Sequence, residues 1–365
     1  MKATGRRQVE IATTVSALLF AVVFFLWLAF HIGGQATVRY FDDLFTALSA
    51  LLACVACSLA ARRQTGSSRR FWLLLGAALL AWTVAEVIWA VYDLVLHVAV
   101  PVPSWADVGY LGAIPLAAAA LLAHPAMHAK GNNRARATLD GLAIGAALLL
   151  LSWNFVLGPL WRHSDISTAG GVVALAYPFG DMIILFLVVL SVRAITATGR
   201  RPLLWVLVGL FAMAVSDSTY AYLVEVGRYS TGNVIDAGWV LGYLAIAVGA
   251  TYETGEAVVA APLEPDGVSL SSLVTPYVPV LSALSVITIK LELHKGVDRL
   301  SWLTGFGLAL LVVARQLLLF VDHRHELFSA ETGPEGIGSE PSENPVPASD
   351  LLEPAPWPHF LRRVP

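Results

Sequence analysis

Charged side chains are scarce in this sequence, in which Lys, Arg, Asp and Glu make up 13% of 365 residues. Soluble domains carry about 25% charged residues. Hydrophobic residues make up 57% of the chain, and several apolar runs reach the roughly 20 residues that cross a bilayer as a helix. The composition therefore excludes an ordinary soluble domain and predicts an all-α fold, a polytopic membrane helix bundle. A membrane barrel would show short alternating segments instead.

Cysteine is equally scarce, with two residues, Cys54 and Cys57, one helical turn apart in one apolar run. Such a pair can indicate redox or metal chemistry, but no second pair accompanies it, and we interpret both as small packing residues. Four histidines predicted on one side of the bundle share no local ligand motif. We therefore predict no metal site and no cofactor. These histidines are His31, His97, His163 and His294.

Motifs for catalysis are also missing from the sequence. It contains no glycine-rich phosphate loop, no metalloprotease helix and no nucleophile elbow, so we predict that the protein is not an enzyme. A net charge of −3 is too small to indicate a nucleic-acid partner.

Apolar runs near the bilayer length predict about ten transmembrane helices. The predicted segments are Ile11–Ile32, Phe41–Ala61, Phe71–Leu96, Asp107–Ala123, Leu139–Leu160, Gly171–Ala194, Pro202–Glu225, Ile235–Thr251, Leu270–Ile289 and Leu300–Val321.

Basic residues in the short loops alternate between a rich side and a poor side, and the rich side is cytoplasmic in membrane proteins. Both termini are therefore predicted in the cytoplasm. The last hairpin departs from the rule, because Lys290, Lys295 and Arg299 fall on the outer side. The rich side holds Lys2, Arg6, Arg7, Arg62, Arg63, Arg69, Arg70, Lys130, Arg134, Arg136, Arg200 and Arg201, and the poor side holds Arg39, Arg162 and Arg228.

Three parts follow from this pattern. Residues 1–10 form a short cytoplasmic N-terminus, and residues 11–325 form the membrane domain. From Glu331 onward Pro, Glu, Ser and Gly dominate, and such a composition cannot bury enough apolar surface to fold. We predict that residues 326–365 are a disordered cytoplasmic tail.

The stretch from Trp82 to Pro115 combines two acids with many aromatics. Glu86 lies inside an apolar run, and Asp107 opens the next run after a short Pro-bearing turn. Ionisable groups are costly in lipid and normally face a bundle interior or a water-filled cavity. This helical hairpin is therefore the first candidate for a functional site.

A second hairpin resembles the first. Asp217-Ser-Thr-Tyr-Ala matches Glu86-Val-Ile-Trp-Ala, and Asp236-Ala-Gly-Trp matches Asp107-Val-Gly-Tyr. Both hairpins run in the same direction through the predicted topology. The match predicts a parallel internal duplication, which is common in membrane folds.

Polar groups from several spans are predicted to share the outer half of the bilayer, with aromatics at the same level. Aromatic walls with a few convergent polar groups are typical of small-molecule pockets. The alternative for acids at helix starts, namely Asp42, Asp43, Asp107 and Asp236, is that they cap the helices. The candidate pocket residues are Glu86, Trp89, Tyr92, Asp107, Tyr110, Asn154, Asp181, Asp217, Tyr220 and Asp236.

Five short patterns stand out along the spans: Trp82…Glu86-Val-Ile-Trp89…Tyr92, Val102-Pro103-Ser104-Trp105-Ala106-Asp107-Val-Gly109-Tyr110, Ala123-His124-Pro125-Ala-Met127, Tyr177-Pro178-Phe-Gly180-Asp181 and Leu241-Gly242-Tyr243-Leu244. Together they resemble the N-terminal multi-span sensor region of actinobacterial GGDEF/EAL proteins, which signal through cyclic di-GMP. In that family the last span leads into a catalytic domain, whereas no Gly-Gly-Asp-Glu-Phe or Glu-Ala-Leu motif follows here.

The resemblance implies a sensory module of the bacterial plasma membrane that lacks its own output domain. Its expected partners are membrane lipid and a separate cytoplasmic or membrane signalling protein, and a homo-oligomer stays open. A proton-coupled small-molecule exporter is the alternative, since intramembrane acids and repeats suit transport. A ligand-free assembly factor is the third hypothesis.

Overall fold

The computed structural model describes residues 2–128, 134–158, 161, 168–194, 200–252, 277–293 and 296–331. Within these ranges the chain forms helices and short connections and contains no strand, which confirms the predicted all-α class. A helix satisfies its own backbone hydrogen bonds, which is the requirement for crossing lipid.

Each of the ten predicted segments overlaps one helix of the structure. The helices are α1 (Lys2–Ala29), α2 (Gln35–Arg62), α3 (Gly66–Ala90), α4 (Trp105–Ala123), α5 (Arg134–Ser152), α7 (Ala169–Ala194), α8 (Arg200–Glu225), α9 (Asp236–Thr251), α11 (Tyr277–Glu292) and α12 (Arg299–Glu331). A π-helical turn, Val91–Val95, extends α3, and another, Trp153–Leu157, extends α5.

Seven of these helices are long and apolar enough to cross a membrane, by length and composition. They are α1, α2, α3, α4, α7, α8 and α12, while α5 and α9 contain shorter apolar stretches, Leu139–Phe155 and Asp236–Thr251. Large apolar side chains such as Leu19, Leu80 and Phe211 are more than half exposed on the outer helix faces. Faces of this kind suit lipid rather than water, so the chain has the build of a multi-pass membrane protein.

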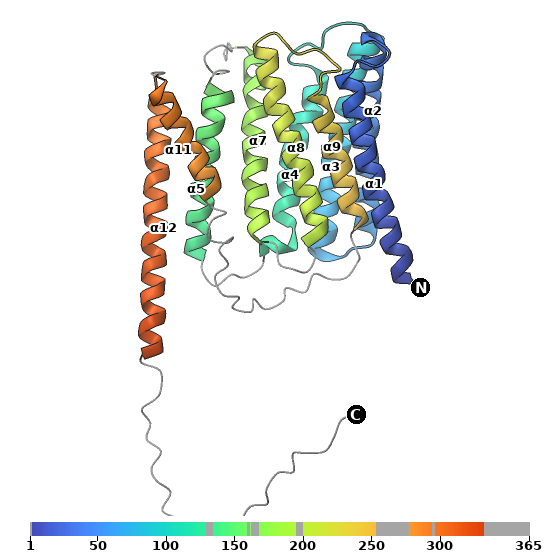
Figure 1. The fold of residues 1–365 in the computed structure, drawn as a ribbon. Helices are drawn as coiled ribbons and strands as arrows, with labels where there is room; N and C mark the ends of the chain where they lie inside the picture. The colour runs from blue at the N-terminus through green and yellow to red at the C-terminus, as the bar shows by residue number, and fades with distance from the viewer. Residues whose placement is uncertain are drawn as a thin grey trace, which may run out of the picture. The chain divides into compact units, whose positions relative to one another are not determined.

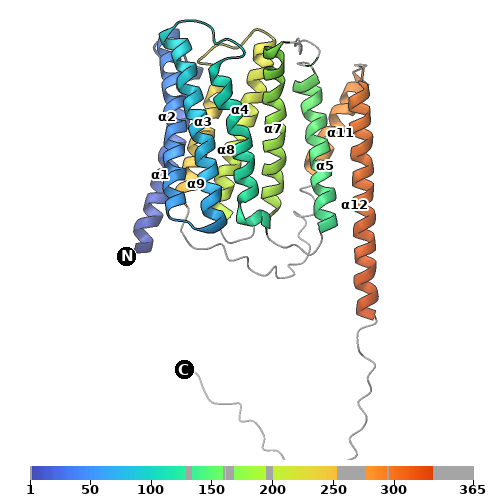
Figure 2. The ribbon, with the colours of Figure 1, turned by 180° about the vertical axis from the view of Figure 1, so that it is seen from behind.

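Six helices form a closed ring in which each contacts the next, in the order α2, α3, α4, α7, α8, α9 and back to α2. Figure 1 and Figure 2 show these helices side by side. Outside the ring, α1 packs on α9, α5 packs on α7, and α11 packs on α5. We call the end where α2, α4, α7 and α9 begin the cavity end, and the opposite end, where α3 and α8 begin, the core end.

One apolar cluster takes residues from all six ring helices. Its largest fully buried members include Trp72, Leu79, Leu121 and Leu210. Close packing of this kind leaves few voids, so the ring is filled toward the core end. Cys57 is fully buried in the same cluster, in agreement with its interpretation as a packing residue.

Several boundaries differ from the prediction. Helix α2 begins at Gln35, six residues before the predicted Phe41, and α1 already begins at Lys2. Helix α12 runs to Glu331 and so enters the predicted tail, while residues 332–365 and the first part of the ninth segment, 270–276, lie outside the described residues. The chain divides into two units, Met1–Gln316 and Leu317–Pro365.

Candidate functional site

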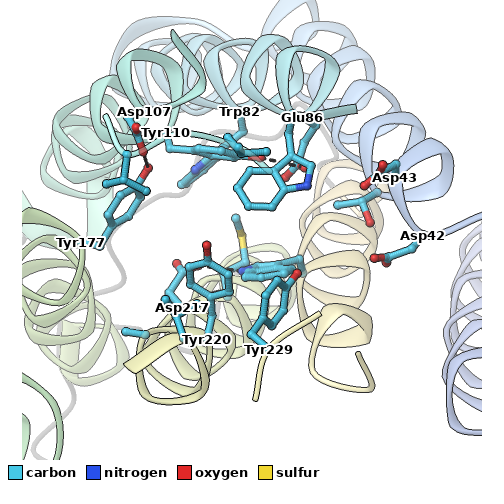
Figure 3. Close-up of a pocket in the computed structure, with 18 of the residues that line it drawn as sticks. Asp42, Asp43, Trp82, Glu86, Asp107, Tyr110, Tyr177, Asp217, Tyr220 and Tyr229 are labelled. Carbon is cyan, nitrogen blue, oxygen red and sulfur yellow. Dashed lines mark hydrogen bonds between the residues drawn. The ribbon is translucent and has the colours of Figure 1, made fainter. Parts of the chain in front are cut away.

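A cavity of about 220 Å³ lies within the ring near the cavity end. Figure 3 shows its side chains converging from several helices, and all six ring helices contribute to the wall. Among the described residues, five acids and eight aromatics line it. These are Asp42, Asp43, Glu86, Asp107 and Asp217, with Trp82, Trp89, Tyr110, Tyr177, Tyr220, Tyr229, Trp239 and Tyr243.

Glu86 projects from α3 and is buried. Its Oε2 accepts a hydrogen bond from the Tyr110 hydroxyl of α4 at 3.0 Å, and its Oε1 accepts one from the Tyr243 hydroxyl of α9 at 2.9 Å. Both carboxyl oxygens therefore have neutral donors, which fix the group in place without supplying a positive charge.

Asp107 has two roles at the start of α4. Its Oδ2 accepts a hydrogen bond from the Ser104 backbone N–H at 2.5 Å, within a capping box. Its Oδ1 accepts one from the Tyr177 hydroxyl of α7 at 2.5 Å. The predicted cap is therefore present, and the same carboxylate also forms part of the cavity wall.

Asp217 lies on α8, at the position of the second hairpin that corresponds to Glu86 in the first. Its Oδ1 accepts a hydrogen bond from Trp239 Nε1 at 2.7 Å, and its carboxyl group interacts electrostatically with that of Asp181 on α7. Asp181 is buried but does not line the cavity, so it supports the wall from behind.

The prediction that Asp42 and Asp43 cap a helix is wrong. Because α2 begins at Gln35, both lie in its second and third turns, where no free N–H groups remain to be capped. They are 4% and 5% exposed and line the cavity. Among the described residues, Asp42 Oδ1 and Asp43 Oδ2 have no hydrogen-bond partner.

The loop before α9 fixes the other oxygen of Asp42. The Gly232 backbone N–H donates to Asp42 Oδ2 at 2.9 Å and to Asp236 Oδ2 at 3.0 Å. Gly232 has a φ of +86°, which favours glycine, and an added Cβ would lie 2.5 Å from Val38 Cγ1. Asp236 also accepts from the Asn233 N–H at 2.8 Å. Because these donors lie in the loop before α9 and no side chain caps that helix, Asp236 fixes the loop behind the wall and does not cap α9, contrary to the capping alternative.

Four further residues predicted to line the pocket have different positions in the structure. Trp89 and Tyr220 line the cavity, whereas Tyr92 does not. Asn154 lies in a separate network: its side chain accepts a hydrogen bond from Lys290 Nζ at 2.6 Å and donates one to Ser301 Oγ at 3.1 Å. The prediction grouped Asn154 with the pocket by depth alone, and depth does not fix which neighbour a helix packs against.

Tyr220 is the centre of an aromatic group within the wall. Its ring lies 4.6 Å from that of Tyr229, 5.8 Å from that of Trp239 and 6.3 Å from that of Trp89, all in edge-to-face geometry. This geometry is the one that aromatic quadrupoles favour. Tyr229 lies in the loop after α8, where burial and the charge of Asp236 raise the pKa of its hydroxyl well above the ordinary value, so Tyr229 remains a neutral donor.

Close helix contacts recur in the two hairpins. A Cβ on Gly109 of α4 would lie 2.7 Å from the Ala81 carbonyl oxygen and 2.9 Å from Ala85 Cβ of α3. A Cβ on Gly238 of α9 would lie 2.0 Å from the side-chain oxygen of Ser216 of α8. Ala85 directly precedes Glu86, and Ser216 directly precedes Asp217, so the same positions of the two hairpins make the close approach.

Among the residues that the structure describes, the cavity lining contains no Lys, Arg or His. Nearby, Arg39 forms an ion pair with Asp93 of the π-helical turn. Arg39 does not line the cavity and pairs mainly with Asp93, but its charge also acts on Asp43 of the wall.

The list of candidate pocket residues left out several side chains of the wall, chiefly Asp42, Asp43, Trp82, Tyr177 and Tyr243. Their signal was weak because aromatics also form ordinary interfacial belts. Only the closure of the ring, which brings α2 against α9, turns these side chains toward one space.

A buried ion pair outside the ring was also missed. Arg315 of α12 pairs with Asp140 of α5, and both side chains are almost fully buried. Arg315 also donates to the Tyr277 hydroxyl at 2.5 Å. This network ties α5, α11 and α12 together.

Within the described residues, no group of three or more His, Cys, Asp or Glu side chains has the geometry to hold a metal ion. Comparisons with protein-family models, with curated proteins and with solved structures found no match to this chain. The fold and the site therefore define a multi-pass membrane protein with an acidic, aromatic-walled cavity.

Proposed function

We propose that this chain is a signal-input module of the bacterial plasma membrane, which binds a small molecule in the cavity and acts through a separate partner protein. The observation that carries the proposal is that all six ring helices contribute to one cavity wall. A ligand there contacts every helix of the ring. It can therefore favour one packing of the ring over another, in proportion to its differential affinity for the two.

The filled core end favours a receptor over a transporter. Trp82, Met213 and Tyr243 belong both to the cavity wall and to the apolar cluster beneath it. They form a floor between the cavity and the core end. A transporter must open its site to both sides in turn, whereas a receptor needs access from one side.

The proposed topology has ten spans, with both termini in the cytoplasm and the cavity open to the outside. Arg62, Arg63 and Arg69 lie where α2 ends and α3 begins, which places the basic clusters at the core end. The basic residue Lys290 on the opposite side is bound by Asn154. Its charge is thus partly satisfied within the protein, which accounts for one exception to the rule.

We infer that the ring arose by duplication of the helical hairpin, extended by one helix. In this proposal α2, α3 and α4 correspond to α7, α8 and α9. Each unit has an acid that accepts from an aromatic of the following helix, Glu86 from Tyr110 and Asp217 from Trp239. The first helix of each unit packs on the last helix of the other, α2 on α9 and α7 on α4.

Substituted-cysteine labelling tests the receptor proposal. In a Cys54→Ser/Cys57→Ala background, Ala221→Cys places a thiol in the cavity wall. Val98→Cys marks the cavity end and Arg63→Cys the core end. We expect a membrane-impermeant maleimide to label Ala221→Cys only from the side that labels Val98→Cys.

Labelling of Ala221→Cys from the Arg63→Cys side as well would contradict one-sided access. It would favour the exporter, and movement of a substrate into liposomes would then be the next measurement. In intact cells the impermeant maleimide reaches only the outer face of the membrane. Labelling of both Val98→Cys and Ala221→Cys in intact cells would therefore support a cavity that opens to the outside.

Proximity labelling from the C-terminus in native membranes tests the partner. The comparison is between the unaltered chain and Ala221→Trp, which fills the cavity. A separate regulatory protein whose labelling changes between the two is expected, and an identical set of labelled neighbours would contradict signal transfer.

A further inference from the structure

We propose that the cavity binds a small primary amine in its ammonium form, with the charged nitrogen at Asp42 and Asp43 and the organic body against the aromatic group around Tyr220. This assignment rests on the proposed function, because it names the class of ligand for the same cavity.

The charged groups of the cavity wall indicate whether the ligand is a cation or an anion. Within the described part of the chain, the wall holds five acidic side chains and no basic ones. The donors that reach Glu86, Asp107 and Asp217 are tyrosine hydroxyls, an indole N–H and groups of Ser104, and all of these are neutral. Buried carboxylates are costly without a compensating positive charge, and neighbouring carboxylates disfavour one another's ionisation. A bound cation removes both costs, so a cation is the ligand that fits this wall.

Two carboxyl oxygens without a hydrogen-bond partner indicate where the ammonium group of the ligand binds. Asp42 Oδ1 and Asp43 Oδ2 are buried and lack a hydrogen-bond partner within the described residues, and Figure 3 shows both carboxyl groups directed into the cavity. A buried acceptor without a donor destabilises the folded chain, so a donor from the ligand is favourable there. A primary ammonium group carries three N–H donors, enough for both oxygens and one more acceptor.

The aromatic group around Tyr220 gives the nature of the remaining part. Trp89, Tyr229 and Trp239 surround Tyr220, and all four line the cavity. Rings of this kind attract cations through their faces and pack against apolar carbon. An inorganic cation would leave this apolar surface without a partner.

The cavity volume limits the size of the ligand. Sites for drug-sized molecules occupy about 300–1,000 Å³, and this cavity has about 220 Å³. The ligand is therefore a compact amine with a short chain or a single ring.

The test uses the full chain in lipid nanodiscs and two probe pairs of matched shape. Phenethylamine and n-butylamine carry the charge at neutral pH, since an alkylammonium group like that of lysine has a pKa of about 10.4. 2-Phenylethanol and 1-butanol are their neutral counterparts. Binding is followed by the change in tryptophan fluorescence, because Trp82, Trp89 and Trp239 line the cavity.

We expect saturable binding of at least one amine, with an affinity about tenfold or more above that of its alcohol. Asp42→Asn and Asp43→Asn should each weaken amine binding by about tenfold or more. Asp298→Asn, a carboxyl change away from the cavity, should leave amine binding unaltered.

Equal affinity for amine and alcohol, or no saturable binding of either amine to the folded chain, would overturn the assignment. The alcohol comparison holds even if an aspartate variant fails to fold. Cysteine labelling separates the two proposals. Amine binding with labelling from both sides would support the amine as ligand and contradict the receptor. Labelling from one side without amine binding would support the receptor and contradict the amine as ligand.

Discussion

The Tyr243 hydroxyl of α9 donates a hydrogen bond of 2.9 Å to Glu86 Oε1 of α3, across 157 residues of sequence. Tyr243 lies in the second of the two similar hairpins and Glu86 in the first. Both side chains belong to the floor and wall of the cavity. This contact joins the two halves of the ring at the level where the ligand is proposed to bind.

Removing a donor to Glu86 should destabilise the ring. Tyr243→Phe and Tyr110→Phe each leave one buried carboxylate oxygen without its hydrogen bond, so we expect each to lower the free energy of unfolding by about 1–3 kcal/mol. The measurement is equilibrium unfolding in mixed micelles. Tyr222→Phe, at an exposed tyrosine, serves as the control.

The two changes should not be additive. Both tyrosines bind one carboxylate, and residues that share a partner usually couple by about 0.5–3 kcal/mol. Additive effects in the double variant, or losses no larger than that of Tyr222→Phe, would show that Glu86 does not depend on these donors.

Close helix contacts predict a second pair of effects. Gly109→Ala and Gly238→Ala would place a methyl group against the backbone or side chain of the preceding helix, and overpacking usually costs about 1–3 kcal/mol. Gly112→Ala, whose Cβ would meet nothing within 4 Å, should be neutral or stabilising. Thermal unfolding in detergent compares the three, and equal melting temperatures would contradict the proposed hairpin contacts.

The ion pair between Asp140 and Arg315 predicts a third result. Removing one partner leaves a buried charge unpaired, which typically costs about 3–5 kcal/mol, whereas replacing both with apolar residues is often tolerated. We expect Asp140→Leu and Arg315→Met each to loosen α12 from α5, and the double variant to be more stable than either. Protease susceptibility of α12 measures this, and a double variant worse than both single variants would refute it.

Asp298 should make the stability of the protein depend on pH. It accepts hydrogen bonds from Ser301 N at 2.8 Å and from Trp153 Nε1 at 2.6 Å. Burial alone would raise the pKa of Asp298, but hydrogen bonds from Ser301 and Trp153 and the charge of Lys290 outweigh it and hold this pKa below its ordinary value.

A lowered folded-state pKa stabilises the protein above the pKa of an unfolded Asp, about 3.9. This contribution is lost as the pH falls through the still lower folded-state pKa. Asp298→Asn should therefore be less stable than the unaltered chain at neutral pH, and the difference should shrink below about pH 4. A difference that stays constant over thermal unfolding curves from about pH 7 to about pH 2.5 would contradict this role.

Apolar run length predicted the helices well, since each predicted segment overlaps one helix. The start of α2 was missed because Gln35 to Tyr40 is not continuously apolar. The helix nevertheless begins at Gln35. Gly33 and Gly34 have positive φ angles, so the turn ends at these glycines and the helix starts directly after them. This displacement of six residues moved Asp42 and Asp43 from a predicted cap to the cavity wall.

The acids of the hairpins were predictable because a carboxylate in an apolar run is rare and costly. Their partners were not. Hydropathy gives the depth of a side chain in the bilayer, whereas the neighbour it faces depends on which helices are adjacent. Asn154 and Glu86 have similar predicted depths, yet the first bonds to Lys290 and Ser301 and the second to Tyr110 and Tyr243.

Native mass spectrometry of the chain released from its own membranes tests most directly whether the ring holds a small molecule. We predict a bound small molecule on the unaltered chain and on Leu80→Trp, which places a tryptophan on an exposed outer face. The adduct should be lost in Ala221→Trp, which fills the cavity. An adduct that persists in Ala221→Trp, or no adduct on the unaltered chain, would contradict this prediction.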